Sequence, residues 1–252
     1  MEMTSLTSGA FTIPRGAGGI TLLELMMALA AGAVLVAAVY TVYIAQARGR
    51  MAQDVSLELQ QGQRAALLTM KQEIRTAGMD PTGKAGARII TAESGAFRFT
   101  RDVTDKNGYG RFDGEISGPN EDIRYAVNSA GNLGRDTCRP APGGQISCSG
   151  LQSMLNHVDA LEFIYLDENG ARISAADLQS QTGRNRIRQV VVTLVVRSGI
   201  AGRGLPPGYV DNRTYKNPFG DPLPDQPFCD RRRRLKISAA IALRNAPPDS
   251  SP

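Results

Sequence analysis

The sequence lacks tryptophan, and its 252 residues include only one histidine, His157, and three cysteines. A histidine-ligated metal site or a Ser-His-Asp triad would therefore depend on His157 alone, and we interpret this residue as structural or surface-exposed. The cysteines form no CxxC pair, which excludes a Cys-rich zinc module and a thioredoxin-like motif. GxSxG, HExxH and phosphate-binding glycine motifs are also missing. We predict that the chain is not an enzyme and uses no cofactor or small-molecule substrate.

The composition excludes a disordered chain. Apolar residues make up 42% of the sequence and charged residues 21%, with a formal net charge of +5. Such a chain has enough apolar side chains for a globular core, and its length allows one or two domains.

Residues 20–45 form an apolar run in which Glu24 is the only side chain that is charged at neutral pH. The stretch 25–45 alone would span about 31 Å as a helix, enough to cross a hydrocarbon core of ~30 Å. The apolar core of a secretory signal peptide is shorter, roughly 7–15 residues. We therefore predict a membrane-spanning helix that stays attached to the protein.

The 19 residues before this run are mostly polar or small and end in two glycines. Glycines leave the backbone accessible to a protease just before helical character begins. Glu24, the fifth residue after Gly19, is favoured by the helix dipole but costly in lipid without a cation. The nearest cation would be the α-amino group created by cleavage before Ile20, in the same chain or in a neighbouring copy.

The segment Gly-Gly-Ile-Thr-Leu-Leu-Glu-Leu-Met at 18–26 resembles the cleavage and methylation signal of type IV pilins and type II secretion pseudopilins. The resemblance implies cleavage between Gly19 and Ile20 by the prepilin peptidase and N-methylation of Ile20. It also implies that Glu24 pairs with the N-terminus of a neighbouring subunit during assembly. Ile20 replaces the usual phenylalanine. The alternative is an uncleaved membrane anchor with an isolated glutamate.

The flanking charges favour the opposite membrane orientation. Arg15 precedes the span, whereas Arg48 and Arg50 follow it, which favours a cytoplasmic C-terminal part. Large domains translocate regardless of such a bias, so we follow the processing signal and expect a periplasmic head.

Residues 46–80 continue the helix with one apolar stripe. Leu67 and Leu68 widen the stripe, Gly78 has the features of a helix C′ residue, and Pro81 prevents continuation. We predict that this half packs on a globular domain; a free coiled coil is the alternative. The residues of the stripe are Val55, Leu59, Gly62, Ala66, Met70, Ile74 and Ala77.

Residues 81–252 show short β-type segments separated by turn residues, so we predict an α+β fold with the long helix packed on an antiparallel β-sheet. A hairpin turn is expected at 167–170 leading into 171–174, a short helix at 177–181, and a long irregular loop at 199–230. The expected strands are Ala87–Thr91, Phe97–Thr100, Ile123–Val127, Ala160–Leu166, Ile187–Arg197 and Leu235–Leu243.

Three further segments resemble the PilW family of minor pilins: 77–83, 121–125 and 161–167. This resemblance implies a low-abundance, pilin-like subunit that initiates a type IV pilus or sits at its tip. It implies contacts with other pilins, the prepilin peptidase and the inner-membrane assembly platform. The protein would be held in the inner membrane and then reach the cell surface in the pilus. A minor pseudopilin of a type II secretion system is the alternative.

The cysteines allow three pairings. Cys138 and Cys148 flank a Pro/Gly loop that bends back easily, so a disulfide between them is favoured in an extracytoplasmic domain, with Cys229 left over. A pairing with Cys229 would instead tie down the long loop.

Two charged clusters have weaker signals. The four arginines 231–234 are interpreted as the solvated start of a strand, because no aromatic residues interleave them as expected for nucleic-acid binding. Asp102, Asp105, Asn107 and Asp113 supply calcium-type oxygen ligands, but their spacing fails the EF-hand pattern. A polar turn is the favoured interpretation there, with a calcium site as the alternative.

Overall fold

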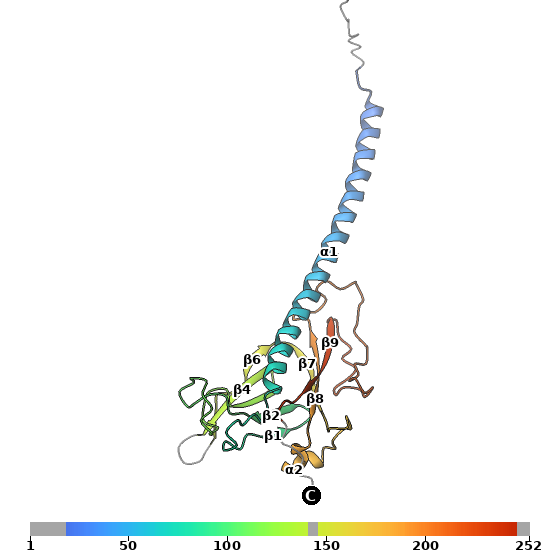
Figure 1. The fold of residues 1–252 in the computed structure, drawn as a ribbon. Coiled ribbons are helices and arrows are strands. Elements are labelled where there is room, and N and C mark those ends of the chain that lie inside the picture. The colour runs from blue at the N-terminus through green and yellow to red at the C-terminus, as the bar shows by residue number, and fades with distance from the viewer. Residues whose placement is uncertain (1–18, 141–145, 246–252) are drawn as a thin grey trace, which may run out of the picture. The chain divides into compact units, whose positions relative to one another are not determined.

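The computed structural model describes residues 19–140 and 146–245. It divides into two compact units, Met1–Ala47 and Arg48–Pro252, which we describe separately. One helix, α1 (Leu22–Ile74), contributes to both units (Figure 1). The leader predicted at 1–19 lies outside the described residues except for Gly19.

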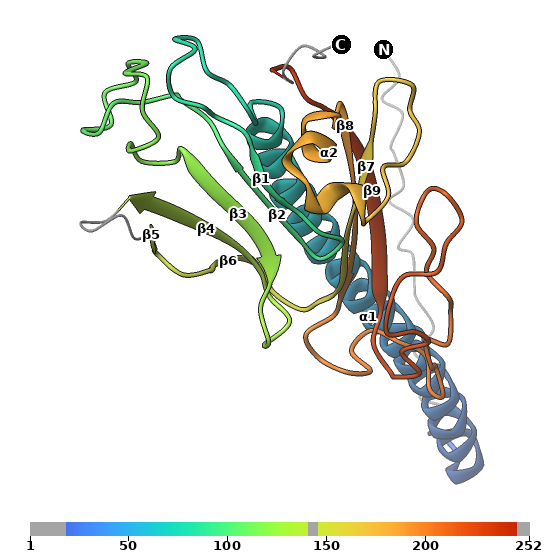
Figure 2. The same cartoon turned by 90° about the horizontal axis from the view of Figure 1, so that it is seen from below.

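The described part of the second unit contains two antiparallel sheets (Figure 2). One has the order β1-β2-β3-β4-β5, with β6 also paired to β4, and the other has the order β7-β8-β9. The elements are β1 (Ile89–Ala92), β2 (Ala96–Thr100), β3 (Asp122–Val127), β4 (Leu133–Pro140), β5 (Ile146–Cys148), β6 (Gln152–Leu155), β7 (Val158–Leu166), η1 (Asp177–Gln179), α2 (Gln181–Asn185), β8 (Gln189–Arg197) and β9 (Arg234–Ala242).

The predicted α+β class with a long N-terminal apolar helix and antiparallel pairing is confirmed. The structure differs in having two sheets instead of one, because β7 pairs with β8 rather than with β6. All six expected strands are present within a few residues, whereas β4, β5 and β6 were not predicted. β4 escapes the β-type pattern because Gly134, Arg135 and Asp136 interrupt its apolar character.

The second half of α1 packs its apolar stripe into a core shared by both sheets. Met70 and Ile74 are fully buried, which confirms packing on the domain rather than a free coiled coil. The prediction for Leu68 was wrong, since this side chain is 58% exposed. Gln63, which was not predicted to be internal, is buried, and its Nε2 donates to the Leu235 carbonyl at 2.7 Å. This bond satisfies the amide that burial removes from water.

The helix ends close to the predicted position. After Ile74 the chain tightens into i→i−3 bonds, from Thr76 N to Glu73 O and from Ala77 N to Ile74 O, both 3.0 Å long. Gly78 then adopts a φ of +74°, which glycine tolerates without the steric penalty of a Cβ, as expected for a residue just past a helix.

The remaining local predictions hold in part. The turn at 167–170 is closed by a 3.1 Å bond from Gly170 N to Asp167 O, but the following segment makes only the isolated bridge between Leu166 and Arg172. The short helix expected at 177–181 is divided into η1 and α2. The segment 199–230 is irregular, as predicted.

Candidate functional site

The start of α1 is the site on which the sequence concentrates its functional signals. Gly19 and Ile20 are non-helical and exposed, and a Cβ added at Gly19 would meet no atom within 4 Å. The backbone on both sides of this peptide bond is therefore accessible to an enzyme in the described structure.

Thr21 and Glu24 cap the first turn of α1. The Thr21 hydroxyl accepts a 3.2 Å hydrogen bond from the Glu24 amide, and the Thr21 carbonyl accepts one of 3.1 Å from Leu25. This is the Ncap-to-N3 half of a T-x-x-E capping box, which the sequence interpretation overlooked. Glu24 thus occupies a position where acidic residues stabilise a helix start, besides being the only charge in the apolar run.

The first unit exposes its apolar side chains all round the helix. α1 contains a segment long and apolar enough to cross a membrane, and none of this segment is buried. A helix that is apolar on every side requires lipid or other helices around it. Its large exposed side chains include Leu22, Leu23, Leu25, Met26, Met27, Leu29, Val34, Leu35, Val36, Val39, Tyr40, Val42 and Tyr43.

A charge network fixes the end of α1 to the larger sheet. The Glu73 carboxylate accepts from Arg135 Nε at 2.9 Å and Nη2 at 2.8 Å, from Arg101 Nη2 at 3.4 Å, and from the Tyr125 hydroxyl. Burial, together with the Glu73 charge, raises the pKa of Tyr125 far above its usual range, so this hydroxyl keeps its proton and donates.

The structure does not bring the four candidate calcium ligands together. Asp102 is fully buried, and its Oδ2 accepts from Gly114 N at 3.1 Å, whereas its Oδ1 has no partner in the described part of the chain. Asp105 accepts from the amides of its own turn, including that of Asn107 at 2.9 Å, and Asp113 does the same with Glu115 at 3.0 Å. These acceptors form polar turns rather than a converging oxygen cage.

Opposite stability changes are expected at Asp102 and Asp105. Burial raises the pKa of Asp102. As the pH rises, this carboxyl therefore ionises in the unfolded chain before it ionises in the folded one. The free energy of unfolding then falls as the pH rises above the usual pKa of aspartate, about 4. Asp102→Asn should therefore unfold at a higher temperature than wild type at neutral pH, and this gain should vanish in acid.

Asp105→Asn is the matched control for this effect. Backbone hydrogen bonds, that of Tyr109 first, lower the pKa of Asp105, so its charged form stabilises the fold at neutral pH and this contribution is lost in acid. Thermal unfolding across this pH range checks both variants. Shifts of the same sign in the two variants would contradict the assigned environments.

Cys138 and Cys148 form a disulfide across β4 and β5, with an S–S distance of 2.08 Å, and Cys229 is free and exposed. This is the pairing that the loop between them favoured. Among the described residues, Asp136 and these two cysteines form the one group of three or more His, Cys, Asp or Glu side chains that lie close enough together to share a metal ion. The two sulfurs are bonded to each other, so they supply no thiolates for a metal.

Removing the disulfide should destabilise the domain. For a closed loop of ten residues, the double variant Cys138→Ser/Cys148→Ser should lose about 3 kcal/mol of folding free energy. Denaturant unfolding measures the loss. Cys229→Ser is the matched control, expected to unfold as wild type does. Equal stability of all three chains would contradict a structural disulfide.

The arginine run contains one buried residue that the sequence interpretation misjudged. The Arg234 side chain is only 2% exposed, and its guanidinium pairs with Asp159 and Asp230 at 2.6 Å and with Asp211 at 3.5 Å. The ring of Phe228 lies 4.3 Å from the guanidinium carbon. Arg234 therefore joins β7, β9 and the 199–230 loop rather than facing solvent.

The other arginines of the run also have structural partners. Arg232 Nη1 donates to Ser198 O at 2.8 Å, and Arg233 Nη1 donates to Ala52 O at 3.3 Å, whereas Arg231 is exposed. The solvated start of a strand therefore describes Arg231 only.

His157 lies in the turn between β6 and β7 with a φ of +61°. Its side chain is exposed and lines a cavity of about 420 Å³ together with Glu58, Arg197 and Arg203. Its carbonyl accepts from Arg197 N at 2.9 Å, so its backbone extends the pairing of β7 with β8.

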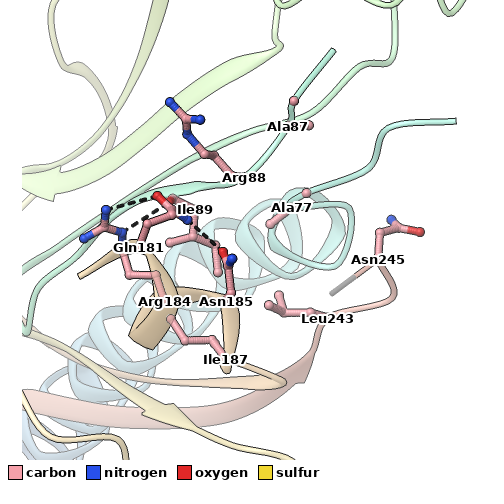
Figure 3. A pocket seen from close by; sticks show the side chains of 12 residues that line it. Ala77, Ala87, Arg88, Ile89, Gln181, Arg184, Asn185, Ile187, Leu243 and Asn245 are labelled. Atoms are coloured by element: carbon pink, nitrogen blue, oxygen red, sulfur yellow. Dashed lines mark hydrogen bonds between the residues drawn. The ribbon is translucent and has the colours of Figure 1, made fainter. Parts of the chain in front are cut away.

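A second cavity, of about 270 Å³, lies where the end of α1 meets β1 and α2 (Figure 3). Its apolar wall includes Ala77, Ile187 and Leu243. The Arg184 guanidinium at its side is used by the fold, donating to Ile89 O at 3.3 Å and to other backbone carbonyls. Gln181, on the same wall, donates to the Asn185 side chain at 2.8 Å and to Ile89 O at 3.3 Å, so its amide is also used by the fold.

Comparisons with known proteins bear on the N-terminal segment. No curated protein matches the chain. Among solved structures, the chain is similar to a type IV-like pilin from Thermus thermophilus, with 18% sequence identity and a TM-score of 0.48, over 75% of this chain and 98% of that one. Residues 14–40 match the family described as the prokaryotic N-terminal methylation motif, and this range contains Gly19, Ile20 and Glu24. The chain thus carries a prokaryotic N-terminal methylation motif at the start of its apolar helix.

Proposed function

We propose that this chain is a minor pilin of the PilW type, which takes part in assembling a type IV pilus by starting the fibre or forming its tip. The observation that carries the proposal is the methylation motif, whose Gly19–Ile20 junction is exposed directly before an apolar helix. The PilW-type segments in the head support the minor-pilin assignment over a generic pilin.

The mechanism is assembly rather than catalysis. Cleavage after Gly19 by the prepilin peptidase would leave Ile20 as the new N-terminus, which is then methylated and keeps a cationic amine. The chain would remain in the inner membrane with its head in the periplasm until the assembly platform adds it to the fibre. There, the exposed apolar surface of α1 would pack against the helices of other pilins.

Glu24 would set the register of this packing. An unpaired carboxylate in an apolar helix bundle costs several kcal/mol, and an amine docked from a neighbouring subunit removes that cost. Only positions where the two charges meet would then be stable. The capping contact between Thr21 and Glu24 N uses the backbone of Glu24, so the carboxylate is not needed for that bond.

Mass spectrometry of the protein purified from its membrane tests the proposal. We expect a polypeptide that begins at Ile20 and is one methyl group heavier than its sequence. A polypeptide that still carries Met1 would contradict it and favour a simple anchored domain. Deletion of the gene separates the pilus from the secretion alternative, because lost secretion with intact surface pili would identify a pseudopilin.

A further inference from the structure

We propose that the outer edge of β9 is a docking site for an extended strand of a different subunit, which would add a fourth strand to the β7-β8-β9 sheet. This inference rests on the proposed role in a fibre, where subunits lie side by side. It concerns a surface of the head and does not depend on Glu24.

The alternation of the ladder shows which backbone groups of β9 point outward. β8 and β9 pair over nine residues without a shift in register. At the two ends of this ladder, Ser198 N donates to Arg233 O at 2.8 Å and Leu243 N donates to Arg188 O at 2.9 Å. Because antiparallel bonding alternates, the odd-numbered residues of β9 bond to β8. The backbone groups of the even-numbered residues from 236 to 242 face away from β8.

These outward groups have no backbone partner within residues 19–140 and 146–245. Proteins usually protect such an edge with proline, a bulge or several charges, since a row of free N–H and C=O groups pairs readily with another strand. On the outward positions from 236 to 242, β9 has one charge, Lys236, and otherwise the small residues Ser238, Ala240 and Ala242; the charge of Arg234, at the start of the strand, is buried in its ion pairs. The edge is therefore long, regular and sterically open.

The apolar side of the same edge is only partly covered. Leu235 and Ile237 of β9, and Leu243 just after it, pack against the core but remain partly exposed. These side chains lie on the core side of the sheet, with the second half of α1. An added strand with apolar residues at alternate positions would complete their burial, which is worth about 25 cal/mol per Å² of apolar surface.

A second copy of β9 does not fit this edge in a fibre. Hydrogen bonds from Arg233 to Ala52 O, from Gln63 to Leu235 O, and from Arg244 N to Arg75 O show that β9 runs in the same direction as residues 52–75 of α1. An antiparallel pair of β9 strands would therefore oppose these helix segments, whereas subunits of one fibre keep their helices parallel.

A parallel pair of β9 strands is also unfavourable. Two copies related by an axis along the strand would place Lys236 beside Lys236 and Arg244 beside Arg244, and like charges facing each other across a strand pair are destabilising. The pairing of two copies through this edge is thus disfavoured in both directions.

The other described edges of this chain do not match a nine-residue strand. β1 and β6 have four residues each, and β5 has three. The outer side of β7 is already occupied, since Phe163 N donates to Ser94 O and Val158 N donates to Gly131 O, each at 2.7 Å. The occupant is therefore a strand of a different protein.

The charges around the edge define the chemistry of that strand. Arg231 and Arg244 are exposed just before and just after β9. The fitting partner is an extended segment with carboxylates near its two ends, apolar side chains on the face toward α1, and small side chains on the other face.

Hydrogen exchange resolved to single amides tests the site directly. The full chain in detergent is compared with the same chain in purified fibres. The outward amides of Lys236, Ser238, Ala240 and Ala242 should exchange at least tenfold more slowly in the fibre, whereas those of Ile237 and Ala239 should be protected in both. Unchanged outward amides in a chain that is present in the fibre would overturn the docking site and leave the proposed function intact. Absence of the chain from the fibre would overturn the proposed function instead, and this inference with it.

A matched pair of variants provides a second measurement. Ala240→Pro removes one outward N–H without touching the bonds to β8, whereas Ala240→Ser keeps it. The proline variant should be incorporated at least tenfold less than the serine variant. Equal incorporation of two chains that unfold at the wild-type temperature would overturn the inference. If the proline lowers the unfolding temperature, the exchange measurement on the wild-type chain decides.

Discussion

Glu24→Ala is expected to leave cleavage and methylation unchanged but to lower incorporation into fibres by at least about tenfold. The variant removes the only charged side chain of the apolar run, so the amine of a neighbouring subunit would lie in the helix bundle without a partner. An unpaired charge in such an environment costs several kcal/mol, and each 1.4 kcal/mol corresponds to about a factor of ten. The ratio of variant to wild-type chain in purified fibres, normalised to the processed chain in the membrane, measures the effect.

Two controls separate the charge of Glu24 from its place at the helix start. Glu24→Gln removes the charge, but glutamine still suits this position of a capping box, so this variant should be lost from fibres as the alanine variant is. Glu58→Ala removes an exposed carboxylate from the same helix, outside the apolar run, and should be incorporated normally. Normal incorporation of the glutamine variant would show that the charge of Glu24 is dispensable.

Glu73→Ala should give the largest loss of stability among the variants considered. The substitution removes the carboxylate that accepts hydrogen bonds from Arg135, Arg101 and the Tyr125 hydroxyl. The Glu73 side chain is only 15% exposed, so water has little access to these donors. Removing one partner of a buried ion pair costs about 3–5 kcal/mol, which for a domain of this size corresponds to roughly 6–20 °C in the unfolding temperature.

Thermal unfolding of the full chain in detergent, followed by circular dichroism, checks this loss. Glu58→Ala again serves as the control and should unfold within about 2 °C of wild type, because surface substitutions change stability by roughly 0.5 kcal/mol or less. If Glu73→Ala unfolds at the same temperature as this control, solvent replaces the lost contacts. The charge network around Glu73 would then be unimportant for stability.

The local features of this fold could be predicted, and the long-range ones could not. The apolar stripe of α1 follows the helical period, and the β-branched run of β8 is typical of a central strand, so neither needs knowledge of distant residues. β4 was missed because Arg135 looks like a surface residue until Glu73, 62 residues away, is placed beside it. The partners of Arg234 are similarly dispersed along the chain. Ion pairs between distant segments leave no periodic signal in a sequence.

The functional features can likewise be divided into local ones, which the sequence reveals, and long-range ones, which it does not. The junction at Gly19 and Ile20 and the position of Glu24 are contiguous, and a short family motif records them. The buried state of Asp102 and the open edge of β9 depend on what lies beside them in three dimensions. Sequence patterns therefore located the methylation motif but gave no indication of the proposed docking edge.

The position of the Thr21 cap bears on the proposed maturation of the chain. With residues 1–19 still attached, α1 already begins at Leu22, and the bonds that start it come from Thr21. Hydrolysis before Ile20 would leave these two bonds to Thr21 in place. Maturation would place a positive charge at the start of α1 without refolding the helix. The precursor is therefore expected not to polymerise because it lacks the cationic amine at Ile20, although its helix is already formed.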